Sequence, residues 1–303
     1  MSRFFALSRT THGMLDMAAP AFCALLWLGG FPRWQTILLS LATGFAAYTA
    51  IYALNDLVGM RNDRQKFAGC GLKPGFSVEA SPQRHPLAQN VLTVRSGLLW
   101  AGAWFAVASV GSYLLNPVVV LVLLAAAALE IVYCLLLKIT YLRTILGGLV
   151  KTSGPIAAVL VLDPKPSPYF LLLLFAWLFF WEIGGQNIPS DWNDTLEDGR
   201  VHAKTIPIRF GPRTAGVIII GALALSVVAS GFLPLISPAR LGVLYVLASL
   251  LLGYFLLLRP SYRLYHFKDG ELARRLFDSA SYYPLAQFAL ISMFLIADGL
   301  LIA

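Results

Sequence analysis

The chain has 303 residues, of which 58% are hydrophobic and 13% are charged, and its formal net charge is +8. A soluble globular domain carries about 25% charged residues, so this composition excludes a soluble fold and indicates a protein whose solvent is the lipid bilayer. No DNA- or RNA-binding motif accompanies the positive charge, and we expect no nucleic-acid partner. Much of that charge reflects membrane topology.

Apolar segments long enough to cross a bilayer, which takes about 20 residues, recur along the whole chain. They predict an all-α integral membrane bundle that forms a single domain over residues 1–303, with no soluble domain attached. Three longer connections fall at about 55–90, 187–212 and 259–280. The nine expected transmembrane helices lie at about 14–30, 34–54, 91–115, 117–137, 141–162, 168–188, 213–236, 240–258 and 281–302.

Most of the 23 Lys and Arg residues lie before the first span or in the loops that follow the second, fourth, sixth and eighth spans. The loops on the other side of the membrane contain few basic residues. The positive-inside rule therefore predicts that the N-terminus and these four basic loops face the cytoplasm.

Carboxylates are scarce, and they gather in two places. Of the 15 Asp and Glu residues, six lie in the segments NDLVGMRND and NIPSDWNDTLED, each directly after a long apolar segment. Charge at the end of a membrane span is costly unless it is compensated. A cation is therefore expected at both places, and a divalent metal ion is the first candidate. The six acids are Asp56, Asp63, Asp191, Asp194, Glu197 and Asp198.

The spacing of the second cluster is helical. If the sixth helix continues through it, Asp191, Asp194 and Asp198 stand at i, i+3 and i+7 and share one face. Asn187 extends the same stripe by one turn. Glu197 points elsewhere, and we expect it to be solvated.

The first cluster has similar spacing, because Asp63 lies seven residues after Asp56 and Asn55 opens the segment. Two rows of carboxylates that face one another would suit a diphosphate bridged by Mg²⁺, which shares its oxygen ligands between protein, water and substrate phosphate. The alternative is that the acids are ordinary solvated loop residues. Two aligned clusters on one face of the membrane favour the metal site.

Basic residues near the clusters form a candidate anion site. Arg84 and Lys204 lie in the two acidic loops, and Lys138 and Arg143 flank the start of the fifth span. A leaving diphosphate requires such positive charge. Each residue has an alternative role as a membrane-edge side chain that reaches toward water.

A few polar residues within spans or loops remain to be explained. Lys151 lies inside a span, so it either pairs with an acid or lines a cavity. Glu130 and Glu182 raise the same question, with a polar contact between helices as the alternative. Neither His85 nor His202 has a second histidine at metal-ligand spacing, and loop polarity accounts for both.

The paired motifs resemble those of the UbiA superfamily of intramembrane prenyltransferases, and the resemblance covers nearly the full length. The first family motif is NDxxDxxxD, which NDLVGMRND matches at Asn55, Asp56 and Asp63. The second is DxxDxxxD with a KTxP-like tail. DWNDTLED and KTIP match it at Asp191, Asp194, Asp198, Lys204, Thr205 and Pro207.

Two shorter elements also resemble the family, and one position departs from it. RHPLAQ is similar to the RPLxxG segment, and Tyr133 with Lys138 is similar to the Tyr/Lys element after the fourth span. The middle Asp of the first motif is Gly59 here, so one carboxylate that the family uses for Mg²⁺ and diphosphate is missing. The departure places the number or affinity of the metal ions in question.

The resemblance implies Mg²⁺-dependent transfer of a prenyl group from an allylic isoprenyl diphosphate to an acceptor within the membrane. Expected partners are the diphosphate, a lipophilic or aromatic acceptor of the quinone-precursor kind, and membrane lipids. The implied metal ligands are Asp56, Asp63, Asp191, Asp194 and Asp198. The implied residues that bind the metal-diphosphate cofactor complex are Asn55, Asp56, Arg84 and Asn187, and the implied catalytic residues are Tyr133, Lys138, Arg143 and Lys204.

Two other functions remain open on this evidence. A UbiA-type membrane terpene cyclase would keep the fold but capture the allylic cation within the same molecule, and Gly59 makes this worth considering. An ion or lipid transporter would use the acids as an ion path. That function requires charges near the middle of the spans, whereas the two clusters lie at span ends on one face.

Overall fold

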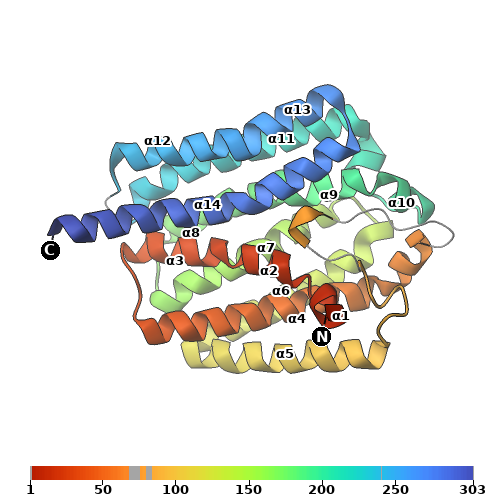
Figure 1. Cartoon of the computed structure of the whole chain (residues 1–303), viewed down its shortest axis with the longest axis horizontal. Coiled ribbons are helices and arrows are strands. Elements are labelled where there is room, and N and C mark those ends of the chain that lie inside the picture. Colours follow the sequence, from red (N-terminus) through yellow and green to blue (C-terminus); the bar gives the residue numbers. More distant parts are fainter. Residues whose placement is uncertain (1, 68–75, 80–83, 240, 303) are drawn as a thin grey trace.

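The computed structural model describes residues 2–67, 76–79, 84–239 and 241–302, and over these residues the chain is helical with no strand (Figure 1). The long helices lie roughly parallel to one another and form a bundle. The α-helices are α1 (Ser2–Leu7), α2 (Thr10–Asp16), α3 (Ala18–Leu28), α4 (Trp34–Phe67), α5 (Val94–Leu115), α6 (Pro117–Leu135), α7 (Arg143–Leu162), α8 (Pro168–Trp181), α9 (Ile188–Asn193), α10 (Thr195–Arg200), α11 (Ile206–Ile236), α12 (Gly242–Gly253), α13 (Arg259–Phe267) and α14 (Gly270–Ile302). Short 3₁₀ turns occur at Ser77–Glu79 and Leu136–Lys138, and π-helical turns at Glu182–Asn187 and Tyr254–Leu258.

Eight helical segments of the described residues are long and apolar enough to cross a membrane. The all-α architecture and the last eight expected spans are therefore confirmed in outline. Proline and asparagine set several of the helix boundaries. Asn116 is extended, and its side chain accepts a hydrogen bond from the Val118 backbone N–H while Pro117 opens α6, so α5 ends and α6 begins at this residue.

The first expected span, 14–30, does not form one membrane-length helix. It is divided into α2 and α3, which meet at Met17. Pro20 has no N–H with which to bond the Asp16 carbonyl, and the Tyr48 hydroxyl donates to that carbonyl instead, at 3.4 Å. The sequence pattern showed the apolar run, but it did not show that a neighbouring helix completes the hydrogen bonding of a broken one.

The second acidic segment also departs from a regular helix. After α8 the chain widens into the π-helical turn Glu182–Asn187, next to Pro189, and α9 ends at Asn193. Asp194 has φ −92° and ψ 10° and separates α9 from α10. The expected continuous stripe of acids is therefore wrong in detail, because the stripe is bent at Asp194.

The core of the bundle lies where α8, α11 and α14 pack together. Trp177 and Trp181 are buried on α8, and the Trp181 indole N–H donates to the Ala280 carbonyl of α14 at 3.0 Å. The π-helical turn approaches α11 closely at Gly184, where a Cβ atom would lie 2.9 Å from the Ile219 carbonyl oxygen. This close approach fixes the position of the turn that leads into the second acidic segment.

Both acidic segments lie at the same end of the bundle. In Figure 1, α9, α10 and the C-terminal end of α4 lie toward the right, whereas the C-terminus of the chain lies at the left. The arrangement of the helices therefore brings the two acidic clusters to one end of the bundle, as expected. Which side of the membrane this end faces remains a prediction from the distribution of Lys and Arg.

We expect Gly184→Ala to destabilise the protein by about 1–3 kcal/mol, because the added methyl group overpacks the contact with α11. The matched control is Gly221→Ala in α11, where an added Cβ meets no atom within 4 Å and where alanine favours the helix by up to about 1 kcal/mol. The measurement is the apparent melting temperature of each purified variant in detergent. Equal melting temperatures would contradict the proposed close packing.

Candidate active site

Ion pairs join the two acidic segments. Lys66, near the end of α4, places its Nζ 2.6 Å from Asp198 Oδ1 of α10 and 4.0 Å from Asp63 Oδ1 of its own helix. Arg84, from the segment before α5, places Nη2 3.4 Å from Asp194 Oδ2. Positive side chains from two elements therefore hold the acidic segments together at one end of the bundle.

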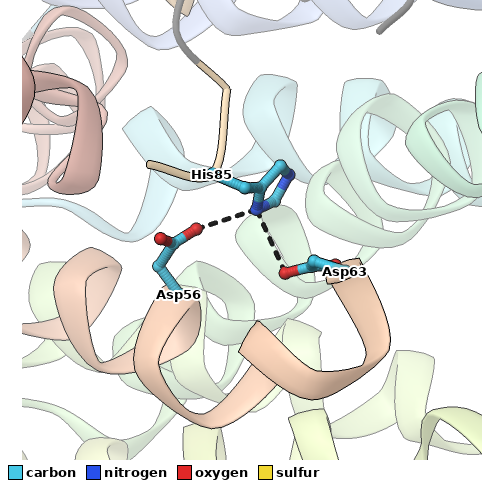
Figure 2. A group of neighbouring side chains, drawn as sticks. All are labelled: Asp56, Asp63 and His85. Carbon is cyan, nitrogen blue, oxygen red and sulfur yellow. Dashed lines mark hydrogen bonds and ion pairs between the residues drawn. The ribbon is translucent and has the colours of Figure 1, made fainter. Parts of the chain in front are cut away.

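The first motif presents Asp56 and Asp63 on the same face of α4, as their spacing predicts. Figure 2 shows the His85 ring between the two carboxylates, and it comes from a different segment. His85 Nδ1 lies 2.8 Å from Asp56 Oδ1 and 3.1 Å from Asp63 Oδ2. Burial alone lowers the pKa of His85, but Asp63 and Asp56 outweigh burial and raise the pKa to about 9.

Neighbouring contacts position the His85 segment. His85 has φ 49°, in the left-handed region that few non-glycine residues adopt. Leu87 is fully buried, and the Arg64 guanidinium donates to the Leu87 carbonyl at 3.3 Å and to Asn90 Oδ1 at 2.9 Å. The imidazole is thus held over α4 by contacts of the residues that follow it, and by the Arg84–Asp194 pair of the residue before it.

The second motif presents a buried carboxylate toward α7. Arg143 Nη2 donates to Asp191 Oδ1 at 2.6 Å, and both side chains are buried. The Arg143 guanidinium also lies over the Tyr133 ring, 4.4 Å from its centroid, an arrangement that stabilises the cation. These three predicted residues therefore form one contact group.

The two predicted asparagines line the inner side of the site. The Asn187 amide donates to the Tyr133 hydroxyl at 3.1 Å, and the Asn55 amide donates to Glu130 Oε1. Asn187 fits here because residue 147 is a glycine: a Cβ atom at Gly147 would lie 2.7 Å from Asn187 Nδ2. The helix contact between Asn55 and Glu130 is the structural alternative that the sequence left open.

Three expectations require correction or refinement. Glu197 is 4% exposed, not solvated, and its Oε2 lies 4.0 Å from Arg84 Nη1. Lys204 is exposed, and no ion pair among the described residues includes its side chain; its backbone N–H bonds to the Leu137 carbonyl instead. Lys138 is partly buried and donates to Gln65 Oε1 at 2.8 Å.

Several buried oxygen atoms in the site have no hydrogen-bond partner among the described residues. Among them are Asp56 Oδ2, Asp191 Oδ2 and Asn187 Oδ1. Buried polar atoms are normally satisfied, and carboxylate and amide oxygens are suitable ligands for a hard divalent cation. The donor set therefore fits a bound metal ion, and water is a further possible partner for individual atoms.

The site opens into a cavity of about 560 Å³ between the helices, a volume typical of small-molecule sites. Asn55, Tyr133 and Asn187 line one end of it. Along α4 the lining residues run from Thr36 to Asn55, which is roughly 28 Å at the rise of an α-helix. Most of the lining side chains are apolar, so the cavity suits an elongated hydrophobic ligand.

A polar cluster lies along this cavity, separate from the acidic motifs. Lys151 Nζ donates to Asp16 Oδ2 at 2.7 Å and to the Tyr52 hydroxyl at 3.3 Å. Glu182 Oε2 lies 4.0 Å from the same ammonium group. Lys151, Tyr52 and Glu182 line the cavity, so both expected roles of Lys151, pairing and lining, are realised together.

Sequence reasoning missed three participants: Lys66, His85 and Asp16. Lys66 lies three residues after Asp63, at helical spacing, and this was an available signal. His85 next to Arg84 in the first acidic loop was also visible, but nothing in the spacing connects it to Asp56. Asp16 carries no signal, because its partner Lys151 is distant in the sequence.

A model of the UbiA prenyltransferase family matches residues 17–291. Comparison with solved structures finds the same fold in UbiA homologues. A UbiA homologue from Aeropyrum pernix K1, in its apo form, is 18% identical, with a TM-score of 0.72 over 95% of this chain and 98% of that chain. A UbiA homologue from Archaeoglobus fulgidus bound to DMAPP and Mg²⁺ is 18% identical, with a TM-score of 0.67 over 96% of this chain and 99% of that chain.

The same Archaeoglobus fulgidus homologue bound to GPP and Mg²⁺ gives 18% identity and a TM-score of 0.68, again over 96% and 99% of the two chains. No curated protein matches the chain. The fold and the paired acidic motifs define a member of an intramembrane enzyme class. The chain belongs to the UbiA prenyltransferase family, and with eight long apolar helices among its described residues it is an integral multi-pass membrane protein.

We expect Lys66→Met to lower the stability of the metal-free protein by about 3 kcal/mol, because Asp198 is left buried without its ion-pair partner. The control is Lys138→Met, which removes an ammonium group that donates to the uncharged Gln65 and is expected to cost about 1 kcal/mol. Melting temperatures measured in the presence of a chelator compare the two variants. If Lys66→Met is no less stable than Lys138→Met, the ion pair does not support the site.

Proposed function

We propose that the chain transfers a prenyl group from an allylic isoprenyl diphosphate to an aromatic, quinone-precursor-like acceptor, with Mg²⁺ as cofactor. One observation carries the proposal: two acidic segments with partnerless buried oxygens meet at the end of a long, mostly apolar cavity. The family and the ligands named for the Archaeoglobus fulgidus homologue support the same substrate class.

We assign the diphosphate to the acidic end. The residues that would hold Mg²⁺ there are Asp56, Asp63, Asp191 and Asp198. When bound, Mg²⁺ supplies neutralisation of the diphosphate oxygens. Asp194 pairs with Arg84, and we assign it to orienting that guanidinium toward the substrate.

The side chains around the leaving group favour departure of the diphosphate. Arg143 and Arg84 supply positive charge, and Asn187 and Tyr133 supply polar contacts at the inner rim. Lys138 lies at the same end and adds a further cation. Preorganised groups of this kind stabilise charge that develops as a bond breaks. Lys204 is exposed, and we assign it to capturing the diphosphate at the entrance.

The reaction balances with groups that this chain holds. The bond between C1 of the prenyl group and the diphosphate oxygen breaks, and the diphosphate leaves with the electron pair. A nucleophilic carbon of the acceptor forms the new bond to C1 and loses one proton. Glu182, which lines the cavity, is positioned to take that proton. The apolar walls exclude water, which would otherwise capture the allylic cation.

We assign the polar head of the acceptor to the cluster of Lys151, Tyr52 and Asp16. A hydroxyl or carboxylate on an aromatic ring would find a donor in the ammonium group and a partner in the tyrosine. Tyr52 lies one helical turn before Asp56, so this cluster begins near the assigned diphosphate end. A cyclase would need no polar recognition of a second substrate, which is why we favour a transferase.

The direct test is mass spectrometry of products formed by the purified chain with Mg²⁺, a panel of prenyl diphosphates and a panel of aromatic acceptors. A prenylated acceptor together with free diphosphate is the expected result. Cyclic hydrocarbons formed without any acceptor would indicate a terpene cyclase. Ion flux in proteoliposomes with no diphosphate release from any prenyl substrate would indicate a transporter.

We expect Asp191→Asn and Asp198→Asn each to reduce diphosphate release by at least about a hundredfold, because each removes a metal-binding charge while preserving shape. Asp298→Ala, an exposed position on α14, is the control and should retain full activity. Released diphosphate is measured alongside the elution profile of the folded protein. Near-normal turnover in both Asn variants would overturn the site assignment.

We expect the double variant Asp16→Asn with Lys151→Met to ionise the prenyl diphosphate but to capture the acceptor poorly. Replacing both partners leaves neither Asp16 nor Lys151 as an unpaired buried charge, although Glu182, 4.0 Å from the Lys151 ammonium, loses that neighbour. Loss of one hydrogen bond to the acceptor, about 1.4 kcal/mol, corresponds to about a tenfold lower ratio of prenylated acceptor to prenyl alcohol. The control replaces another ion pair, Glu271 and Arg274, by glutamines. An unchanged product ratio in the double variant would place the acceptor elsewhere.

A further inference from the structure

The first acidic motif lacks its middle carboxylate at Gly59, and the space near that position is occupied. A Cβ atom at Gly59 would lie 3.2 Å from Asp63 Oδ2, which is closer than side-chain carbons normally approach an oxygen. The Asp63 carboxylate therefore extends over the glycine. The space that a carboxylate at position 59 would occupy is therefore partly filled by the Asp63 carboxylate.

His85 enters the same place from another segment. Its Nδ1 atom and one carboxylate oxygen from each of Asp56 and Asp63 all lie within 4.8 Å of one another. Figure 2 shows dashed lines running from the same ring nitrogen to both carboxylates. One histidine thus brings a nitrogen atom into contact with both remaining acids of the motif.

The spacing of these three atoms matches a metal-coordination shell. Neighbouring ligand atoms of an octahedral ion with bonds of about 2.1 Å are about 3 Å apart. His85 Nδ1 lies 2.8 Å from Asp56 Oδ1 and 3.1 Å from Asp63 Oδ2. The second oxygen of Asp56 is buried, with Asp56 only 3% exposed, and has no hydrogen-bond partner among the described residues.

The position of His85 is also built into the fold. Arg84, the preceding residue, is buried and paired with Asp194, and Leu87 two residues later is fully buried. The left-handed backbone at His85 is retained between these two anchors. A ring held this way loses little additional freedom when it binds an ion, which favours binding.

We propose that His85 is a metal ligand that replaces the carboxylate missing at Gly59, and that this makes the two metal sites of the chain unequal. The first site, with one nitrogen and two carboxylates, binds Mn²⁺ or a later first-row divalent ion in preference to Mg²⁺. The second site, built from Asp191 and Asp198, keeps only oxygen ligands and remains a Mg²⁺ site. The inference deepens the proposed function and rests on it for the second ion.

Ligand chemistry gives the direction of this preference. Carboxylate and water ligands suit Mg²⁺, whereas an imidazole nitrogen suits Zn²⁺, Fe²⁺ and other transition ions. Affinity for a site with nitrogen ligands rises from Mn²⁺ toward Cu²⁺ along the first-row series. Replacing one carboxylate by imidazole also removes one negative charge, which weakens the attraction for Mg²⁺ more than for an ion that binds nitrogen well.

The test uses the purified full-length chain, freed of metal and titrated with Mn²⁺ alone. Electron paramagnetic resonance measures bound against free Mn²⁺, and pulsed measurements detect coupling between the ion and a coordinated imidazole nitrogen. We expect two classes of Mn²⁺ site, of which the tighter shows nitrogen coupling and resists competition by Mg²⁺.

The test variant is His85→Asn, because asparagine tolerates the left-handed backbone. We expect it to lose the nitrogen coupling and to bind Mn²⁺ at the tight site at least about tenfold more weakly. Mutation of residues that only hydrogen-bond to a metal ligand already lowers metal affinity by about tenfold or more. His202→Asn is the matched control. His202 also has a positive φ, of 56°, and it is exposed, so its replacement should change neither signal.

The nitrogen coupling measured in the native chain keeps the inference testable if His85→Asn folds poorly, and a double variant tests the metal preference. Gly59→Asp together with His85→Asn restores an oxygen-only site, and it should lower the ratio of Mn²⁺ to Mg²⁺ affinity without restoring nitrogen coupling. Absence of nitrogen coupling in the native chain with the tight site filled, or its persistence in His85→Asn, would overturn the proposal.

Diphosphate release measured on the same preparations separates this inference from the proposed function. Nitrogen coupling without turnover of any prenyl diphosphate would leave the His85 ligand in place and reject the transferase. Turnover of a prenyl diphosphate without nitrogen coupling would support the transferase and reject His85 as a metal ligand.

Discussion

The structure depends on compensation of carboxylates that are removed from water at one end of an apolar bundle. Asp198 is 1% exposed and Asp56 is 3% exposed, and isolated charges at such positions are costly. Side chains from other elements offset part of that cost: the cations of Lys66 at Asp198 and Arg143 at Asp191, and the imidazole of His85 at Asp56. Since removing one partner of a buried pair costs several kcal/mol, these contacts fix how α4 meets α10 and how α7 meets α9.

Close packing places the charged end of the bundle next to the apolar cavity. Gly147 and Gly184 allow Asn187 and the π-helical turn to approach their neighbours at distances that any side chain would prevent. The turn carries Glu182 toward the cavity and Asn187 toward Tyr133. An irregular helix next to a proline is costly in a membrane unless neighbouring groups satisfy it, and here the irregularity brings residues of both functional regions to one helix.

The sequence predicts the fold well because apolar run length and helical spacing are local properties. It also predicts that Asp56 and Asp63 share a face of α4, because this follows from their spacing alone. It fails where the partner is remote: Pro20 and Tyr48 together break the first span, and Arg84 buries Glu197 from a segment more than a hundred residues away. Spacing within one segment does not contain these contacts, because tertiary packing brings them together.

The difference between the two motifs follows from the same distinction between sequence and space. A metal ion responds to the atoms around it, whatever segment they come from, so a nitrogen supplied by His85 can do what an oxygen at position 59 no longer does. A carboxylate on the helix and a histidine on the loop differ, however, in charge and in the ions they favour. The glycine at position 59 therefore indicates a change in metal selectivity at the first motif. Loss of the reaction does not follow, because the acids of the second motif and their basic partners are all present.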